Sequence, residues 1–215
     1  MISAWIEDVP TGAGPGWHRY ITSLRISNWL KWALAGHDLD IQMRTSLAQQ
    51  TRYLSKTLNY DELDHKLFNN GKALLFAGLC LDDEQSSIWR ERGLKLVQGY
   101  LPKLLGADGG YLGLSPMYHS ALLNDLLDLH NLLRAFGQPR LPELDRAIQS
   151  ARCWLAAMCH PDGQISLFND TALDVVAAPA ELEAYAYRLD LSARPQLTPG
   201  LTRLRETGFA RLAIG

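Results

Sequence analysis

The stretch "DGGYLGLSPMYHSALLNDLLDLHNLL", residues 108–133, sets the fold class of this chain. A glycine turn leads into Ser115 and Pro116, a pair that favours the start of a helix, because serine caps backbone N–H groups and proline suits the first helical position. Leucines then recur at helical spacing. The stretch therefore predicts a long amphipathic helix that carries Tyr118 and His119 side by side in its first turn.

Five further segments show apolar residues at helical spacing, and short turns separate them. They cover residues 23–36, 41–58, 67–81, 86–105 and 141–159. The breaks contain glycine, proline and aspartate, which are typical helix stops, and they fall at Gly36, Asp82-Asp83, "GADGG", "GQPRLP" and "HPDG". About six helices with short connections predict an all-α, antiparallel array.

Some of these helices are apolar on more than one stripe, notably around Trp29 and Trp32 and in "ALLFAGLCL". A helix of this kind is packed on most of its sides. An α/α toroid built from helical hairpins would produce the pattern, and a helical solenoid would produce it as well. No internal sequence repeat separates the two architectures.

The C-terminal part has a different character. From about Gln164 the helical signal weakens, and the final "GFARLAIG" alternates as a strand does. A lone strand has no visible partner, which suggests that the chain stops before its sheet is complete. We therefore expect a helical domain over residues 1–198 and a truncated first strand of a β domain over residues 199–215.

Composition limits the classes of function. The chain has 215 residues, 47% of them hydrophobic, and a formal net charge of −2, so it predicts a soluble globular protein with no basic field for nucleic acid. No segment is apolar for the roughly 18 residues that span a bilayer, and no export signal is visible. Three cysteines without CxxC spacing predict buried thiols.

The six histidines show no ligand-pair spacing with a carboxylate or thiol, so the sequence predicts neither a metal site nor a cofactor. They are His18, His37, His65, His119, His130 and His160.

Four strings together resemble the heparinase II/III-like family of polysaccharide lyases, in its helical N-terminal domain. They are "WHRYITSLRISNWLKW", "NNGKALLFAGL", "DGGYLGLSPMYHSALLNDLLDL" and "HPDGQISLFND", in the family's order and approximate spacing. The resemblance implies an incomplete α/α toroid followed by a β-sandwich, with the active site in the cleft between them. It also implies that the chain is a fragment, with "LRETGFARLAIG" as the first β-domain strand.

Lyases of this family cleave beside a uronic acid by β-elimination, which needs a group that neutralises the carboxylate, a base and an acid. The resemblance makes Tyr118 the candidate base or acid, and the positive end of the helix dipole would favour its phenolate. His119 falls on the apolar face with the leucines. By default it is a core histidine that donates to a backbone carbonyl, and a direct catalytic role is the alternative.

Arg25, Asn28 and Trp29 form a candidate sugar site, because a guanidinium binds carboxylate or sulfate, an amide binds hydroxyls and an indole face stacks on a pyranose ring. The alternative is that Trp29 belongs to the core and Arg25 caps a neighbouring helix. Asn169 either faces the cleft as a substrate contact or only closes a turn.

The chain departs from the family at the residue that neutralises the carboxylate. The family has an asparagine there, in a Gly-Asn-His-Leu segment, whereas this chain reads Asp64-His65-Lys66-Leu67. A protonated His65, or the cation of Lys66, could still neutralise a uronate. The family's further catalytic histidine lies in the β domain, so the partner of Tyr118 is either His65 or a residue outside this chain.

The sequence therefore predicts the helical domain of a uronate-polysaccharide lyase, impaired as an isolated fragment. A non-catalytic carbohydrate-binding domain and a helical protein-interaction scaffold stay open, so enzymatic activity itself is undecided. The expected partner is an acidic polysaccharide of heparan, alginate or exopolysaccharide type, and truncated domain edges would favour self-association. By resemblance the location would be periplasmic or secreted, if the N-terminus is truncated.

Overall fold

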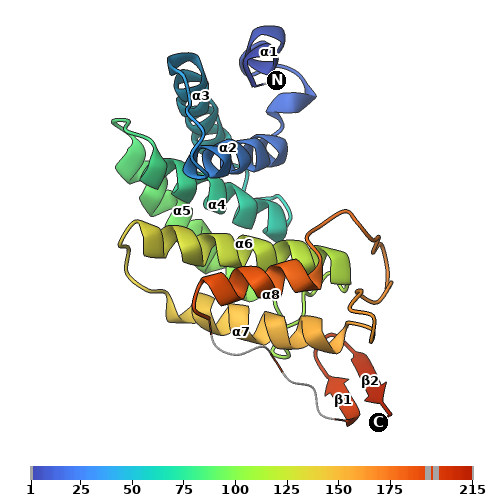
Figure 1. The fold of residues 1–215 in the computed structure, drawn as a ribbon. Helices are drawn as coiled ribbons and strands as arrows, with labels where there is room; N and C mark the ends of the chain where they lie inside the picture. The colour runs from blue at the N-terminus through green and yellow to red at the C-terminus, as the bar shows by residue number, and fades with distance from the viewer. Residues whose placement is uncertain (1, 192–194, 196–198, 215) are drawn as a thin grey trace. The chain divides into compact units, whose positions relative to one another are not determined.

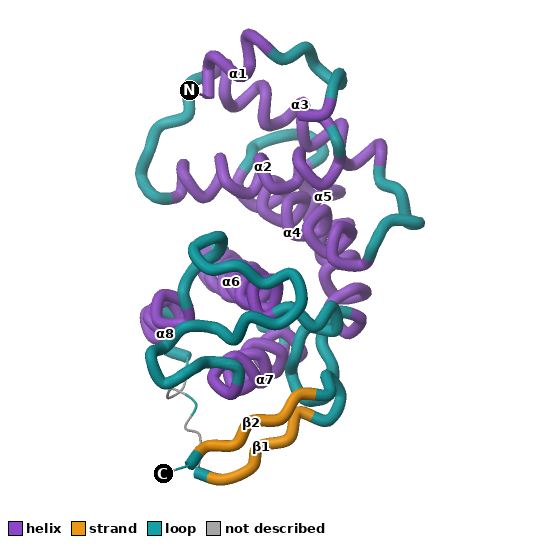
Figure 2. Tube along the Cα trace, turned by 90° about the vertical axis from the view of Figure 1, so that its right-hand side faces the viewer, coloured by secondary structure: helices purple, strands orange, loops and turns teal. Residues whose placement is uncertain are grey.

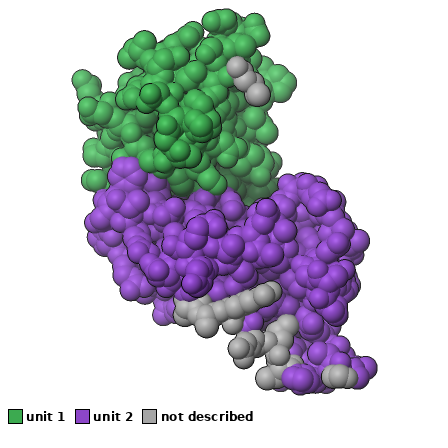
Figure 3. Space-filling view, in the orientation of Figure 1, with its two compact units in different colours: residues 1–101 green, residues 102–215 purple. Residues whose placement is uncertain are grey.

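The computed structural model describes residues 2–191, 195 and 199–214. The chain divides into two compact units, Met1–Leu101 and Pro102–Gly215 (Figure 3). Helices make up most of the first unit and are the main regular structure of the second, and the described residues form one two-stranded sheet near the C-terminus (Figures 1 and 2). The domain boundary expected after residue 198 falls at residues 196–198, outside the described part of the chain.

The first unit is built around one central helix. Its elements are α1 (Ile2–Asp8), the 3-10 turn η1 (Pro15–Trp17), α2 (Arg19–Leu34), α3 (Ile41–Thr57), α4 (Asp64–Cys80) and α5 (Ser86–Tyr100). Helix α4 packs against both α2 and α5, and every residue from Asn70 to Ala77 is buried. The multi-sided burial expected from "ALLFAGLCL" is therefore confirmed.

Glycines let α4 and α5 approach closely. A Cβ on Gly93 of α5 would lie 2.5 Å from the backbone nitrogen of Leu75 and 2.7 Å from the carbonyl oxygen of Gly71, both on α4. A Cβ on Gly78 would lie 2.5 Å from the backbone nitrogen of Arg90. The two backbones therefore touch directly, with no room for a methyl group, and the helices run antiparallel.

The second unit holds two long helices, one shorter helix and a hairpin. Its helices are α6 (Pro116–Ala135), α7 (Pro142–Ala157) and α8 (Pro179–Arg188), and the 3-10 turn η2 (Leu101–Lys103) begins at the last residue of the first unit. Helix α6 supplies most of the core, with leucines buried from Leu122 to Leu133. Contacts of His119 with Ala151 and of His130 with Asp145 show that α7 runs antiparallel to α6.

The hairpin pairs β1 (Gly200–Leu204) with β2 (Phe209–Ala213) in antiparallel register, from Gly200 opposite Ala213 to Leu204 opposite Phe209. The strand expected in "GFARLAIG" is confirmed, but the expectation that it lacks a partner is wrong. Leu204 and Phe209 pack against Trp154 of α7. Because an isolated hairpin is only marginally stable in water, this packing on a helix is what stabilises it.

The six helices predicted from periodicity are present, and their breaks fall where glycine, proline and aspartate were expected. Helices α1 and α8 were missed. Helix α1 has seven residues, too few for a periodic signal, and α8 buries only Leu182 and Ala186. The start of α8 is nevertheless encoded locally, because Pro179 opens it and the Glu181 carboxylate accepts the Ala178 N–H at 2.8 Å.

The three cysteines form no disulfide. Cys80 and Cys159 are half-buried, whereas Cys153 is exposed, so the expectation of buried thiols is wrong for Cys153. Burial raises the pKa of the Cys80 thiol to about 12. Across the residues that the structure describes, no helix combines the length and the apolar character needed to cross a membrane.

The close approach of α4 and α5 gives a stability prediction. We expect Gly93→Ala to lower the free energy of unfolding by about 1–3 kcal/mol, because the added methyl group overlaps the α4 backbone. Gly99→Ala on the same helix meets nothing within 4 Å and should raise stability by about 0.5–1 kcal/mol. Urea unfolding followed by circular dichroism measures both. Equal effects of the two substitutions would contradict this packing.

Candidate functional site

Tyr118 lies in the first turn of α6 with its side chain accessible. The Ser115 side chain caps this helix by accepting the Tyr118 N–H at 3.4 Å, and Pro116 occupies the first helical position. Tyr118 is 47% exposed in a turn whose other residues are buried. Its phenol therefore stands at a capped, dipole-positive helix end where an anionic ligand would be favoured.

His119 points the opposite way, into the core of the second unit. Its Nδ1 accepts the Tyr111 N–H at 3.2 Å, and its Nε2 faces the Ala151 carbonyl oxygen at 3.0 Å. These partners require the neutral tautomer with the proton on Nε2. The ring also packs on Trp154, with 4.3 Å between ring centroids. Burial lowers the pKa of His119 to about 4.

Both ring nitrogens of His119 are thus held by backbone groups of the protein, and its side chain has no exposed surface. This geometry is the one expected of a core histidine that donates to a backbone carbonyl. It gives no support to the direct catalytic role that was the alternative.

The loop that contains Asn169 and Thr171 forms hydrogen bonds with the start of α6. The Asn169 side chain donates to the Leu114 carbonyl oxygen at 2.5 Å, and both residues have positive φ angles, 52° and 59°. The Thr171 hydroxyl lies 3.1 Å from the Ser115 hydroxyl and accepts the Met117 N–H at 3.4 Å. Asn169 stays exposed beside Tyr118's helix turn, so it closes a turn and remains accessible. Sequence reasoning missed Thr171.

In the first unit, His65 and Lys66 lie in the first turn of α4, and both are partly buried. The Tyr20 ring meets the His65 ring edge-on, with 6.0 Å between centroids. Burial lowers the pKa of His65, Lys66 lowers it further, and Asp64 opposes them. His65 is therefore neutral at pH 7, which argues against the protonated imidazole considered from the sequence.

Arg25 is engaged by the protein itself. Its Nε donates to Gln50 at 2.7 Å and its Nη1 to the Gly16 carbonyl oxygen at 2.6 Å. Its guanidinium lies 3.9 Å from the centroid of the Trp5 ring. Burial lowers the pKa of Arg25 to about 10, so it stays charged at pH 7. These contacts tie α1, η1 and α3 to α2, a structural role.

The other two residues of the predicted sugar site, Asn28 and Trp29, differ in their exposure. Trp29 is partly buried and meets Trp5 edge-on at 5.5 Å, whereas Asn28 is exposed. Arg25 and Trp29 therefore both contact Trp5, whereas Asn28 is exposed on the same helix. The aromatic partners Trp5, Trp17 and Tyr53 were missed, because they come from α1, η1 and α3.

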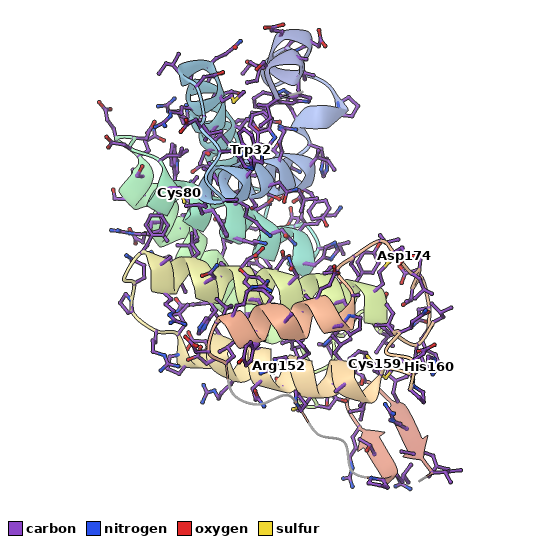
Figure 4. All side chains as sticks on the ribbon, in the orientation of Figure 1. Trp32, Cys80, Arg152, Cys159, His160 and Asp174 are labelled. Carbon is purple, nitrogen blue, oxygen red and sulfur yellow. The ribbon has the colours of Figure 1, made fainter. Side chains whose placement is uncertain are left out.

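Another polar cluster joins α7 to α8. Arg152, 3% exposed, donates to both carboxylate oxygens of Glu183 on α8, at 2.9 and 2.7 Å. It lines a cavity of about 270 Å³ together with Cys159 and His160 (Figure 4). Within the described residues, no group of three or more histidine, cysteine or acidic side chains is arranged to hold a metal ion.

The architecture is an incomplete α/α toroid, as predicted. A crystal structure of heparinase III matches it with a TM-score of 0.77 and 15% identity, covering 98% of this chain and 38% of that one. A crystal structure of heparan sulfate lyase from Pedobacter heparinus matches with a TM-score of 0.64 and 20% identity, covering 98% and 37%.

Residues 32–187 match the Heparinase II/III N-terminus family, and the chain belongs to this family. Among curated proteins, a heparin-sulfate lyase of Pedobacter heparinus is 28% identical over 138 residues. Those residues make up 61% of this chain, which spans only 20% of that protein. The family resemblance seen in the four sequence strings is thus confirmed.

The buried His119 predicts how stability depends on pH. Its folded-state pKa of about 4 lies below the usual 6.5, so the unfolded chain takes up the proton first as the pH falls. The contribution of His119 is complete above pH 6.5 and is lost between pH 6.5 and about 4. The corresponding loss in the free energy of unfolding is about 3 kcal/mol.

The matched variant is His119→Gln, whose amide can replace the Nε2–H donor to Ala151 but does not titrate. Urea unfolding at pH 7.0 and 4.5 should show a smaller loss of stability for the variant than for the wild type. The same loss in both proteins would show that His119 is not a buried neutral imidazole.

Proposed function

We propose that this chain is the helical part of a lyase that cleaves a uronate-containing polysaccharide by β-elimination. The observation that carries the proposal is the exposed phenol of Tyr118, held at the capped start of α6 above a buried, neutral His119. Membership of the heparinase II/III family supports it. A tyrosine in this position can exchange a proton with a bound sugar without a metal or cofactor.

A β-elimination requires three kinds of group from the protein: a base, an acid and a group that neutralises the carboxylate. A base removes the proton from C5 of the uronate, the C5–H electron pair forms a double bond between C4 and C5, and the C4–O4 bond breaks. The leaving O4 then takes a proton from an acid. Because C5–H is not acidic beside an ionised carboxylate, a donor or cation must first reduce the charge on that carboxylate.

Tyr118 serves as base, as acid, or as both in turn. In the first unit, the family resemblance makes His65 the candidate hydrogen-bond donor to a uronate carboxylate, and Lys66 is the candidate cation beside it. Asn169 is the candidate contact for sugar hydroxyls in the second unit, and Asn28 and the part-exposed indole of Trp29 are the candidate sugar contacts of the first unit. His119 holds the Tyr118 turn in place, and Arg25 holds the first unit together.

The substrate is an acidic glycosaminoglycan of the heparin or heparan sulfate type, by analogy with the named activities of the relatives. Alginate and bacterial exopolysaccharide are the uronate polymers to compare with it. The chain spans a fifth of the curated relative, so we expect slow turnover by this segment alone, and self-association through apolar edges.

A non-catalytic, carbohydrate-binding domain is the second candidate. The specific observation that favours it is His65, which stands where the family has an asparagine and whose pKa is lowered by burial. A neutral imidazole offers one N–H donor, whereas an amide offers two, so His65 is less suited than asparagine to hydrogen-bond a carboxylate.

The first functional prediction concerns Tyr118. We expect Tyr118→Phe to lower kcat on heparan sulfate by about 100-fold or more, with little change in affinity, because only the proton-transfer group is removed. Absorbance of the unsaturated product measures turnover, and calorimetry measures binding. Tyr187→Phe, on the 82% exposed tyrosine of α8, is the matched control and should behave as the wild type. Unchanged turnover in Tyr118→Phe would refute the assignment.

The second prediction concerns His65. We expect His65→Asn to raise kcat/KM at pH 7 by on the order of 10-fold, because the amide donates to the carboxylate at every pH. Lys66→Gln, which removes the neighbouring cation, should lower it. If the wild type and His65→Asn both bind oligosaccharide and neither turns it over, the chain is a binding domain.

A further inference from the structure

The turn of the C-terminal hairpin is joined to the helices by a buried polar contact. Thr207, 6% exposed, donates from both its backbone N–H and its hydroxyl to the same oxygen of Asp108, at 2.8 and 2.9 Å. Its hydroxyl oxygen also accepts the indole N–H of Trp154 at 2.9 Å. Thr207 thus joins two partners that are distant in sequence, Asp108 at a separation of 99 residues and Trp154 at a separation of 53.

Asp108 also forms a hydrogen bond with the glycine loop that precedes α6. Its second oxygen accepts the Gly110 N–H at 3.0 Å, within the turn from Gly106 to Gly110. Burial alone would raise the pKa of Asp108, but hydrogen bonds from Thr207 and Gly110 outweigh it and lower that pKa. Asp108 is therefore a carboxylate fixed from two sides, and the loop leads directly to Tyr111.

Trp154 forms a second link, because it contacts both Thr207 and His119. Its ring packs on the imidazole at 4.3 Å between centroids, while Tyr111 donates to Nδ1 of the same imidazole. Gly110 lies so close that a Cβ there would overlap both the Trp154 indole and the Thr207 methyl group. The hairpin turn, the glycine loop and α7 therefore converge on the residue next to Tyr118.

We propose that Thr207 is a positioning residue for Tyr118: through Asp108 and Trp154 it fixes the His119 ring, and with it the first turn of α6. The inference rests on the proposed function only for its catalytic consequence. Its structural content is that the hairpin turn and the helix carrying Tyr118 form one rigid assembly. Thr207 lies in the segment that sequence reasoning treated as the start of a separate domain.

The test uses Thr207→Val, which keeps the shape and the backbone N–H but removes the hydroxyl. In the wild type, nitrogen NMR should show His119 as the Nε2–H tautomer. In Thr207→Val, we expect the His119 ring signals and the Tyr118 ring signals to shift, and the Trp154 indole proton to exchange with solvent faster. Thr202→Val, in the paired part of β1, is the matched control and should leave all three unchanged.

Thr207→Ser keeps the hydroxyl and should restore the wild-type signals, which a general loss of packing would not allow. Where turnover is measurable, Thr207→Val should lower kcat by on the order of 10-fold with KM unchanged, because the proton-transfer group is misplaced rather than removed.

Two results overturn different claims. If Thr207→Val leaves the His119 and Tyr118 signals as they are in Thr202→Val, the positioning role is wrong, whatever the turnover. If the signals shift as expected but Tyr118→Phe does not affect turnover, the positioning contact stands and the proposed function fails.

Discussion

The buried imidazole of His119 is the interaction on which the second unit depends. It bridges the Tyr111 backbone before α6 and the Ala151 carbonyl on α7, segments that no regular secondary structure connects. A neutral ring fits this position because it both accepts and donates, whereas a charged ring could only donate. The low pKa of His119 is the physical sign that the neutral form is the one selected.

The first unit depends on a different constraint, the direct contact between the backbones of α4 and α5. Gly71, Gly78 and Gly93 make this contact possible, and it leaves α4 buried along most of its length. Around this pair, Arg25 joins the N-terminal elements through hydrogen bonds and its position over Trp5. A charged side chain is tolerated there because its donors are used by Gln50 and Gly16.

The proposed chemistry depends on the different environments of two neighbouring residues, Tyr118 and His119. Tyr118 and His119 are adjacent in sequence, but the helix turns one outward and the other inward. The exposed phenol can meet a substrate, and the buried imidazole keeps the turn beneath it in place. Thr171, Asp108 and Thr207 extend this support from loops and from the hairpin. The proposed site therefore relies on more residues than the tyrosine that is proposed to transfer the proton.

The sequence by itself determined the six longer helices, α2 to α7, and the breaks between them, because caps, glycine stops and apolar spacing act within a few residues. It also placed Tyr118 at a capped helix start and His119 on the apolar face for that reason. Only the tertiary structure decided that Arg25 is held by Gln50 and Gly16, that His65 is neutral, and that the final strand pairs with residues 200–204. These properties arise from burial and from partners supplied by other elements, which local spacing does not encode.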